Sequence, residues 1–306
     1  MPSCFKPWIL LVWVIAMQEY VMTNKLEKLF KIISAPNSNN RVVNAFLDGE
    51  GKGVAINDKK DGQTALHAAV LEDNAGVVEC LLQHNADKEG LDNHLWTPLM
   101  AAVLYKREKS LEVLLKYKAK TDMSYPTSGD AILSTAVSNG YTNIVKSLLN
   151  HGMDPKNVKS TTGLPMVHLA AMKGHVGTVE ALLEHEAKSN KGRQTTSISE
   201  IANNMNAIQW AVDHGNVAVM RVLMKYDRDA ENKIKNDLLY EDGSTLLLEA
   251  AQSGQLEVVK ALVEEYGANV ELKGDKNWNN TPLHFAREFA RRDTAKYLEK
   301  KIKEKQ

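Results

Sequence analysis

A short block of residues recurs along this 306-residue chain at a nearly constant interval. It is first clear from Thr64 to Ala69, which read TALHAA, and related blocks begin 33 to 41 residues apart at positions 97, 131, 165, 206, 245 and 281. A second block lies downstream of each, with apolar residues at i, i+1, i+4 and i+5, the spacing of a helix with one apolar face. A unit of this size cannot bury its apolar face alone, so the sequence predicts a row of units stacked on one another.

The repeated blocks resemble the ankyrin repeat family, whose signature is T-P-L-H-x-A at a period near 33 residues, with a β-turn and two helices per unit. Both motifs recur in register over about seven units, which cover residues 59–304. The resemblance implies an all-α solenoid of stacked helix-turn-helix units with β-turn or hairpin links, over residues 59–306. It also implies structural anchors, in which a threonine caps the first helix and a histidine bonds that threonine and a backbone group. The anchor residues are Thr64, His67, Thr97, His168, Thr245, Thr281 and His284.

The residue two positions before each anchor block occupies a turn that requires a positive φ angle. Glycine adopts this conformation without strain, and asparagine tolerates it better than most residues do. Six units carry a suitable residue, namely Gly62, Gly129, Gly163, Asn204, Gly243 and Asn279. The second unit has Leu95 instead, which predicts a strained or rebuilt turn.

The two ends of the array and two of its links differ from the standard unit. Residues 23–58 carry helical patterns at Leu26–Ile33 and Arg41–Leu47, which predicts a degenerate N-terminal cap repeat. The last helix, Asp293–Lys305, is polar and rich in lysine, as expected of a C-terminal cap. The links at residues 189–205 and 228–242 are long. Each has three interpretations: a tolerated surface insertion, an extended hairpin or a partner-binding insert.

Residues 1–22 form a hydrophobic N-terminal segment, whose apolar run from Trp8 to Met17 has several interpretations. The run fits the core of an export signal cleaved after Ala16. It also fits a helix packed on the array, an upstream extension before Met17 or Met22, or a short anchor at the membrane interface. We expect a cytoplasmic protein, with a secreted or membrane-associated protein as the alternative and residues 8–17 as the segment that would contact lipid.

Composition and motif content argue against catalysis and against nucleic-acid binding. Lys and Arg together number 38, as do Asp and Glu, so the formal net charge is zero. Proteins that bind nucleic acids through their phosphate groups are usually basic. The cysteines, Cys4 and Cys80, are too few for a disulfide framework or a four-cysteine zinc site. The histidines recur along the array instead of converging. The sequence therefore predicts a non-enzyme with no metal, no cofactor and no nucleic-acid partner.

Arrays of this family have a concave face built from turn tips and first helices, and the resemblance implies the same face here. Its exposed positions are the residue before each anchor block and the residues after the alanine pair. Apolar side chains at several of these positions predict a protein interaction surface. The predicted surface comprises Trp96, Leu104, Tyr105, Asp130, Asn139, Leu164, Met172, Lys173, Met205 and His214.

We therefore expect a monomeric, non-catalytic scaffold or adaptor that binds another protein, with Trp96 and Tyr105 as its main contacts. Two alternatives remain open. One is an exported or membrane-anchored, effector-like protein, and the other is a regulatory subunit that masks a partner enzyme or transcription factor. A fold shared by many proteins does not identify the partner.

Overall fold

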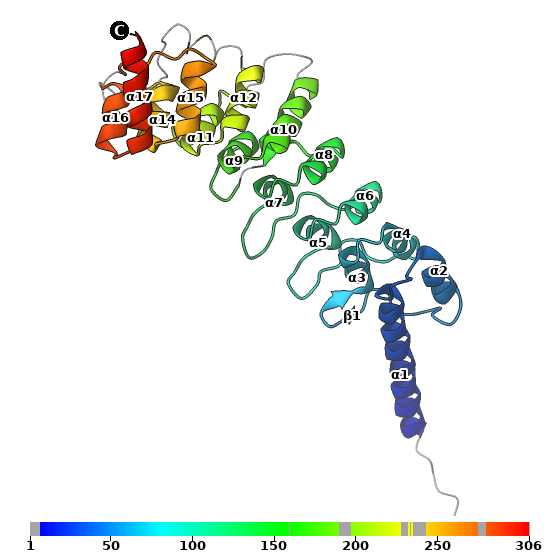
Figure 1. The fold of residues 1–306 in the computed structure, drawn as a ribbon. Helices are drawn as coiled ribbons and strands as arrows, with labels where there is room; N and C mark the ends of the chain where they lie inside the picture. Colours follow the sequence, from blue (N-terminus) through cyan, green and yellow to red (C-terminus); the bar gives the residue numbers. More distant parts are fainter. Residues whose placement is uncertain are drawn as a thin grey trace, which may run out of the picture. The chain divides into compact units, whose positions relative to one another are not determined.

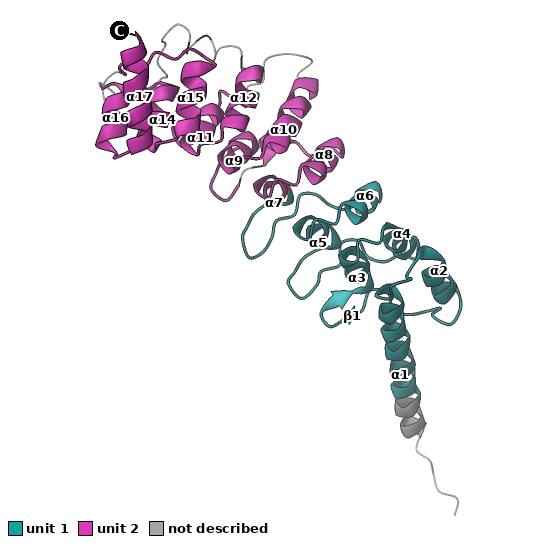
Figure 2. Ribbon diagram, in the orientation of Figure 1, with its two compact units in different colours: residues 1–132 teal, residues 133–306 magenta. Residues whose placement is uncertain are grey.

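The computed structural model describes residues 7–158, 160–189, 197–227, 232, 234, 243–274 and 280–305, with side chains from residue 14 onward. The described part consists mainly of paired helices joined by turns (Figure 1). It divides into two compact units, residues 1–132 and 133–306, which Figure 2 shows in different colours. The helical fold that the repeat predicts is therefore confirmed.

The described part of unit 1 contains a long N-terminal helix, five shorter helices and one β-hairpin. Its helices are α1 (Pro7–Ile33), α2 (Asn40–Asp48), α3 (Ala65–Leu71), α4 (Ala75–Gln83), α5 (Pro98–Leu104) and α6 (Glu108–Lys116). The strands β1 (Lys59–Lys60) and β2 (Gln63–Thr64) form an antiparallel hairpin before α3, with Lys59 opposite Thr64. Helix α3 packs on α5, and α4 packs on α2 and α6, so the pairs stack in sequence order.

Unit 2 repeats this arrangement. Its helices are α7 (Ile132–Ser138, starting at the last residue of unit 1), α8 (Thr142–Asn150), the 3-10 helix η1 (Pro155–Asn157), α9 (Met166–Lys173), α10 (Val176–Ser189), α11 (Ala207–Asp213), α12 (Val217–Tyr226), α14 (Leu246–Ser253), α15 (Leu256–Glu264), α16 (Pro282–Glu288) and α17 (Arg292–Lys305). First helices pack on first helices, as α9 does on α11, and second helices pack on second helices, as α10 does on α12.

The apolar positions of the repeat form the core of each unit. In the pair α3 and α4, for example, Leu66, Ala69, Val78 and Leu81 are almost completely buried. Burial of each large aliphatic side chain contributes about 1.5–3 kcal/mol, while the small alanine lets the helices approach closely. Because these contacts lie within and between pairs, each pair depends on its neighbours for its core.

The anchor threonines begin the first helices. The hydroxyl groups of Thr64, Thr97, Thr245 and Thr281 each accept a hydrogen bond from the backbone amide three residues later. A cap of this kind contributes about 1 kcal/mol to helix stability. In the first anchor, the imidazole Nδ1 of His67 lies 2.8 Å from the Thr64 hydroxyl and its Nε2 lies 2.9 Å from the Trp96 carbonyl oxygen. His67 therefore joins its own helix to the turn of the next pair.

His168 and His284 differ from His67. His168 Nε2 lies 2.8 Å from the Glu200 carbonyl, but Pro165 replaces the anchor threonine, and the buried Nδ1 has no hydrogen-bond partner among the described residues. His284 is exposed, and its Nε2 lies 3.6 Å from Glu288. The predicted role of His284 in joining turns is therefore corrected.

The N-terminal helix crosses the predicted boundary between residues 22 and 23 without a break. Its second half packs on α2 and α3 through the buried side chains of Leu26, Leu29 and Ile33. The first described side chains of α1, in contrast, are exposed. Within the residues that the structure describes, no helix combines the length and the apolar character needed to cross a membrane.

The long links are described only in part. Residues 190–196 and nearly all of 228–242 lie outside the described residues, as does Asn279. The remaining part of the first link is packed, because Ile198 is buried and the Ala202 backbone pairs with that of Met205. Residues 197–205 are therefore integrated into unit 2, which differs from a loose surface insertion.

Candidate protein-binding surface

A turn in unit 1 holds Leu95 in a conformation that leucine rarely adopts. The Leu95 φ angle is 61°, whereas the same position is glycine in four other described turns and asparagine in a further one. The turn is built around buried Asp92, whose carboxylate accepts hydrogen bonds from the amides of His94 and Trp96 at 2.8 and 2.9 Å. A positive φ angle costs a non-glycine residue about 1–2 kcal/mol. The leucine is nevertheless 56% exposed, so burial of its side chain does not compensate for this strain.

Aromatic rings lie beside this turn. The ring of Trp96 is 5.0 Å from that of His94, 6.4 Å from that of Tyr105 and 6.0 Å from that of Tyr125, which it meets edge to face. Tyr125 is buried, and its hydroxyl donates a hydrogen bond to the Met100 carbonyl at 2.7 Å. Trp96 is therefore half-buried and supported from within, while Tyr105, at the C-cap of α5, is 49% exposed.

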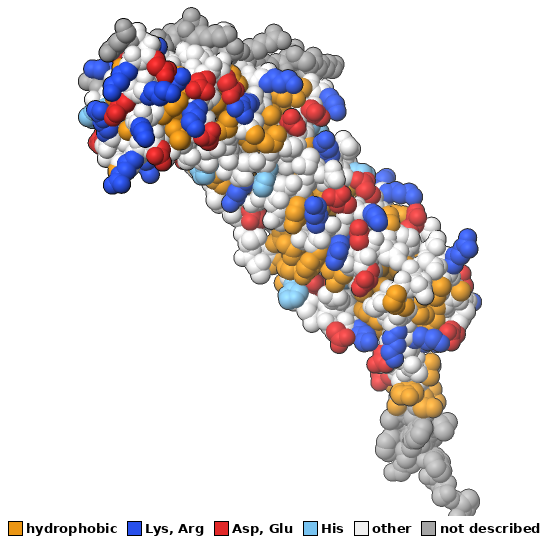
Figure 3. Space-filling view, in the orientation of Figure 1, with side chains coloured by type: hydrophobic (Ala, Val, Ile, Leu, Met, Phe, Trp, Pro, Cys, Tyr) orange, Lys and Arg blue, Asp and Glu red, His pale blue; other side chains and the backbone are white. Residues whose placement is uncertain are grey.

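These side chains form one exposed apolar area in unit 1. We name it the Leu95–Tyr105 surface, and it comprises Leu91, His94, Leu95, Trp96 and Tyr105. Figure 3 shows hydrophobic side chains gathered over α5 and the loop that follows α6. Exposed aromatic and aliphatic side chains that are supported by a rigid frame are typical of protein interaction surfaces.

The structure corrects part of the predicted surface. Leu164 is almost completely buried, because the position before a helix N-cap often packs on the first turn of that helix. Its amide and carbonyl both bond to Ser160, which closes the turn inward. Trp96 and Met205 also stand before a helix N-cap, and both are only half-exposed. Leu104, Asp130 and Met172 are half-exposed as well. Asn139, Lys173 and His214 are exposed, and Asn139 bonds the Thr135 carbonyl in its own turn at 2.8 Å.

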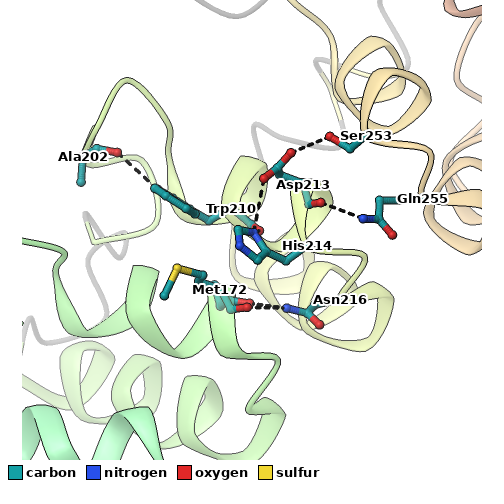
Figure 4. A network of polar contacts seen from close by, with 9 residues as sticks. Met172, Ala202, Trp210, Asp213, His214, Asn216, Ser253 and Gln255 are labelled. Carbon is teal, nitrogen blue, oxygen red and sulfur yellow. Dashed lines mark hydrogen bonds and ion pairs between the residues drawn. The ribbon is translucent and has the colours of Figure 1, made fainter. Parts of the chain in front are cut away.

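In unit 2, two predicted residues lie within a network of polar contacts that connects three helix pairs (Figure 4). Asn216 donates hydrogen bonds from Nδ2 to the carbonyls of Ala171 and Met172, at 2.8 and 3.0 Å. Gln255 reaches the Asp213 carbonyl at 2.9 Å, and the exposed ring of His214 lies 5.5 Å from that of Trp210. Met172 and His214 therefore sit at helix ends that neighbouring pairs hold in place.

The sequence interpretation missed the residues that make these inter-pair contacts. Each stands just before a second helix and bonds a carbonyl near the end of the preceding pair's first helix. These residues are Asn74, His175, Asn216, Gln255 and Arg291, which contact Ser38, Ser138, Met172, Asp213 and Gln252 in that order. The signal in the sequence was a long polar residue directly after the positive-φ residue that ends the first helix.

We expect Asn216→Ala to lower the free energy of unfolding of unit 2 by about 2 kcal/mol, because two carbonyls at the end of α9 would lose their donor. Asn157→Ala is the matched control, since Asn157 is exposed and bonds only within its own turn. Urea unfolding of both variants measures the difference. Equal losses in the two variants would show that the contact between pairs contributes little.

The described residues offer little for catalysis. Burial raises the pKa of the Cys80 thiol to about 11, so the thiol stays protonated at neutral pH. Its Sγ lies 2.9 Å from Asn44 Oδ1, as in a structural contact. Among the described residues, no group of three histidine, cysteine, aspartate or glutamate side chains is placed to hold a metal ion.

Comparison with known proteins identifies the repeat. The family model described as "Ankyrin repeats (3 copies)" matches residues 31–125, 133–236 and 229–306. The chain is 30% identical over 225 residues to "Ankyrin repeat and KH domain-containing protein mask-1" of Caenorhabditis elegans, covering 72% of this chain and 8% of that protein. It is 29% identical over 145 residues to human "Rabankyrin-5", covering 44% of this chain and 12% of that protein. The chain thus spans only a small fraction of these relatives.

Two solved structures share the fold. The ankyrin repeat domain of Bcl-3, described as "a unique member of the IkappaB protein family", superposes with a TM-score of 0.56 at 24% identity, covering 74% of this chain and 96% of that one. The ankyrin repeat domain of human ASB11 gives a TM-score of 0.53 at 20% identity, covering 73% and 92%. At these identities the likeness concerns the fold alone.

Proposed function

This chain belongs to the ankyrin repeat family, and we propose that it is a non-catalytic scaffold that binds a protein partner through the Leu95–Tyr105 surface. Ankyrin repeats generally mediate protein–protein interaction, which supports the general role. The single observation that carries the proposal is Leu95, a strained and exposed leucine at a turn where other units have glycine or asparagine. Strain that packing does not explain is typical of functional positions.

The proposed mechanism is docking onto a surface that is already formed. Asp92 fixes the turn that carries Leu95, and Tyr125 supports Trp96 from within unit 1. A partner would therefore bury Leu95 and Tyr105 without ordering flexible segments first, which lowers the entropic cost of binding. We propose that the exposed residues Asn139, Lys173 and His214 of unit 2 add polar contacts. We further propose a monomer in the cytoplasm.

Tyr105→Ala tests the proposal with little risk to the fold. Because Tyr105 is half-exposed at a helix end, its truncation is expected to change stability by less than about 0.5 kcal/mol. Its loss from a binding surface is expected to weaken capture of the partner at least about tenfold. Trp96→Ala is less suitable, because the Trp96 ring packs against Tyr125 and its loss would also destabilise unit 1.

The measurement is affinity capture with the wild type and each variant side by side, followed by identification of the proteins that differ. Tyr117→Ala is the matched control, since Tyr117 lies at the C-cap of α6, the second helix of the same pair. Capture that survives Tyr105→Ala, or that falls equally in both variants, would contradict the proposal. The effect of the protein on the captured partner's own activity separates a regulatory subunit from a passive scaffold.

A further inference from the structure

The described N-terminal part of α1 exposes apolar side chains on every side. Val14, Ile15, Ala16 and Met17 are consecutive and exposed, and successive residues of an α-helix point about 100° apart. These residues therefore cover the whole circumference of the helix. Ile15 is 47% and Met17 52% exposed. A helix that is apolar all round is normally buried in a protein core or in lipid.

The opposite end of the same helix is firmly held. Leu26, Leu29 and Ile33 are buried where α1 packs on α2 and α3. Figure 1 shows that the rest of α1 extends away from these two helices. The apolar residues from Val14 to Met17 thus lie on the part of α1 that projects away from α2 and α3.

The length of the apolar run fits one half of a bilayer. Residues 8–17 are all apolar, and ten residues of α-helix are about 15 Å long, half of a hydrocarbon core of about 30 Å. Tyr20 follows the run and is exposed, as is common for aromatic residues at a membrane–water interface.

Lysines lie on α1 beyond the apolar run. Lys25 precedes the packed base, and Lys28 and Lys31 lie within it. Lys25, Lys28 and Lys31 belong to α1 itself, and the Lys25 ammonium donates a hydrogen bond to the carbonyl of Lys52 at 2.8 Å. Lys28 pairs with Glu50 at 2.6 Å, so part of this charge is neutralised, and Glu19 and Glu27 also lie on α1. Figure 3 shows lysine and arginine side chains gathered where α1 meets the rest of unit 1. Lysines at this depth attract the headgroups of anionic lipids.

We infer that the apolar half of α1 inserts into the surface of an anionic phospholipid bilayer, with its lysines at the headgroups. Lipid surrounds an inserted helix and so covers all four of the exposed residues. A helix from a second copy of the chain would cover one stripe and leave the opposite side in water. The inference is independent of the proposed protein partner, because the Leu95–Tyr105 surface lies on other elements of unit 1.

The test is co-sedimentation of the full chain, its N-terminus checked by intact mass, with phosphatidylcholine vesicles and with mixed phosphatidylcholine–phosphatidylserine vesicles. The wild type is expected to bind the mixed vesicles more tightly. Ile15→Glu/Met17→Glu is expected to weaken binding at least about tenfold, since these side chains would enter lipid. Lys25→Glu/Lys31→Glu is expected to remove the preference for phosphatidylserine. Ile201→Glu is the control, an exposed apolar residue outside α1 and outside the Leu95–Tyr105 surface, and is expected to bind the vesicles normally.

Four results would overturn the inference. The first is a wild type that does not sediment with either vesicle, and the second is binding that the Ile15→Glu/Met17→Glu variant retains. The third is a dimer, seen by light scattering without vesicles, that the same variant dissociates. A protein purified from its native source with an N-terminus near Met17 would also overturn it, because the inserted segment would be absent.

Discussion

Acidification from about pH 7.5 to about pH 5.5 is expected to lower the total free energy of unfolding, by at most about 3 kcal/mol, because burial favours the neutral form of two histidines in the folded protein. His67 and His168 are almost completely buried, and burial lowers the pKa of both imidazoles below their usual 6.5. Hydrogen bonds to the carbonyls of Trp96 and Glu200 oppose this shift without reversing it.

The direction follows from the two protonation states. Well above pH 6.5 both histidines are neutral in the folded and unfolded chains, so they do not affect the difference in free energy. As the pH falls through 6.5 the unfolded chain binds protons more readily than the folded chain does, which favours unfolding by at most about 1.4 kcal/mol per histidine at pH 5.5. The bond to the Cys80 carbonyl raises the pKa of His84, which opposes the trend, but His84 is largely solvated and its effect is small.

Urea unfolding across this pH range measures the effect, and the chain itself suggests the control. Gln209 occupies the histidine position of its own unit and bonds the Asn206 amide there. We therefore expect His67→Gln/His168→Gln to remain folded and to lose most of the pH dependence. Because the two histidines lie in different compact units, each single variant should remove the pH dependence of stability in one unit only. A wild type that is equally stable at both pH values would contradict the assignment.

The architecture could be predicted because the residues that determine it recur in every unit along the chain. Every unit carries its own anchor, alanine pair and apolar second helix, so an error in one unit does not affect the others. The turn rule also identified Leu95 as the exception, and the structure places it in the left-handed region. Single positions on the surface were harder to predict. Leu164 shares its position in the unit with Gln63 and Asp130, which are half-exposed, but its own apolar side chain is buried.

Other features depend on contacts that one sequence does not contain. Tyr125 lies in a loop and supports Trp96 only because the fold brings two turns together. The contacts between pairs use asparagine, histidine, glutamine and arginine in turn, so they share geometry but not residue type. The sequence predicts a boundary between residues 22 and 23, where the hydrophobic segment is followed by the cap repeat. The backbone of α1 nevertheless continues through this boundary as one helix.

Leu95→Asn is expected to change stability and binding in opposite directions. Asparagine tolerates a positive φ angle, so the substitution should raise the free energy of unfolding of unit 1 by about 1 kcal/mol. The same substitution removes an exposed aliphatic side chain from the proposed docking surface. We expect the affinity for the partner to fall at least about tenfold, as for the loss of an apolar contact at the centre of an interface.

Lys118→Asn provides the matched control in the same unit. Its φ angle is 59°, its side chain is exposed, and it follows α6 instead of lying on the Leu95–Tyr105 surface. Relief of strain alone should therefore raise stability in both variants. Only the loss of a binding residue should separate them.

The most direct measurement is thus the affinity of wild type, Leu95→Asn and Lys118→Asn for the protein whose capture depends on Tyr105, with thermal stability recorded for each. We predict that both variants melt at a higher temperature and that only Leu95→Asn binds more weakly. A Leu95→Asn variant that is more stable and binds as tightly as the wild type would show that the strained leucine is not kept for a partner.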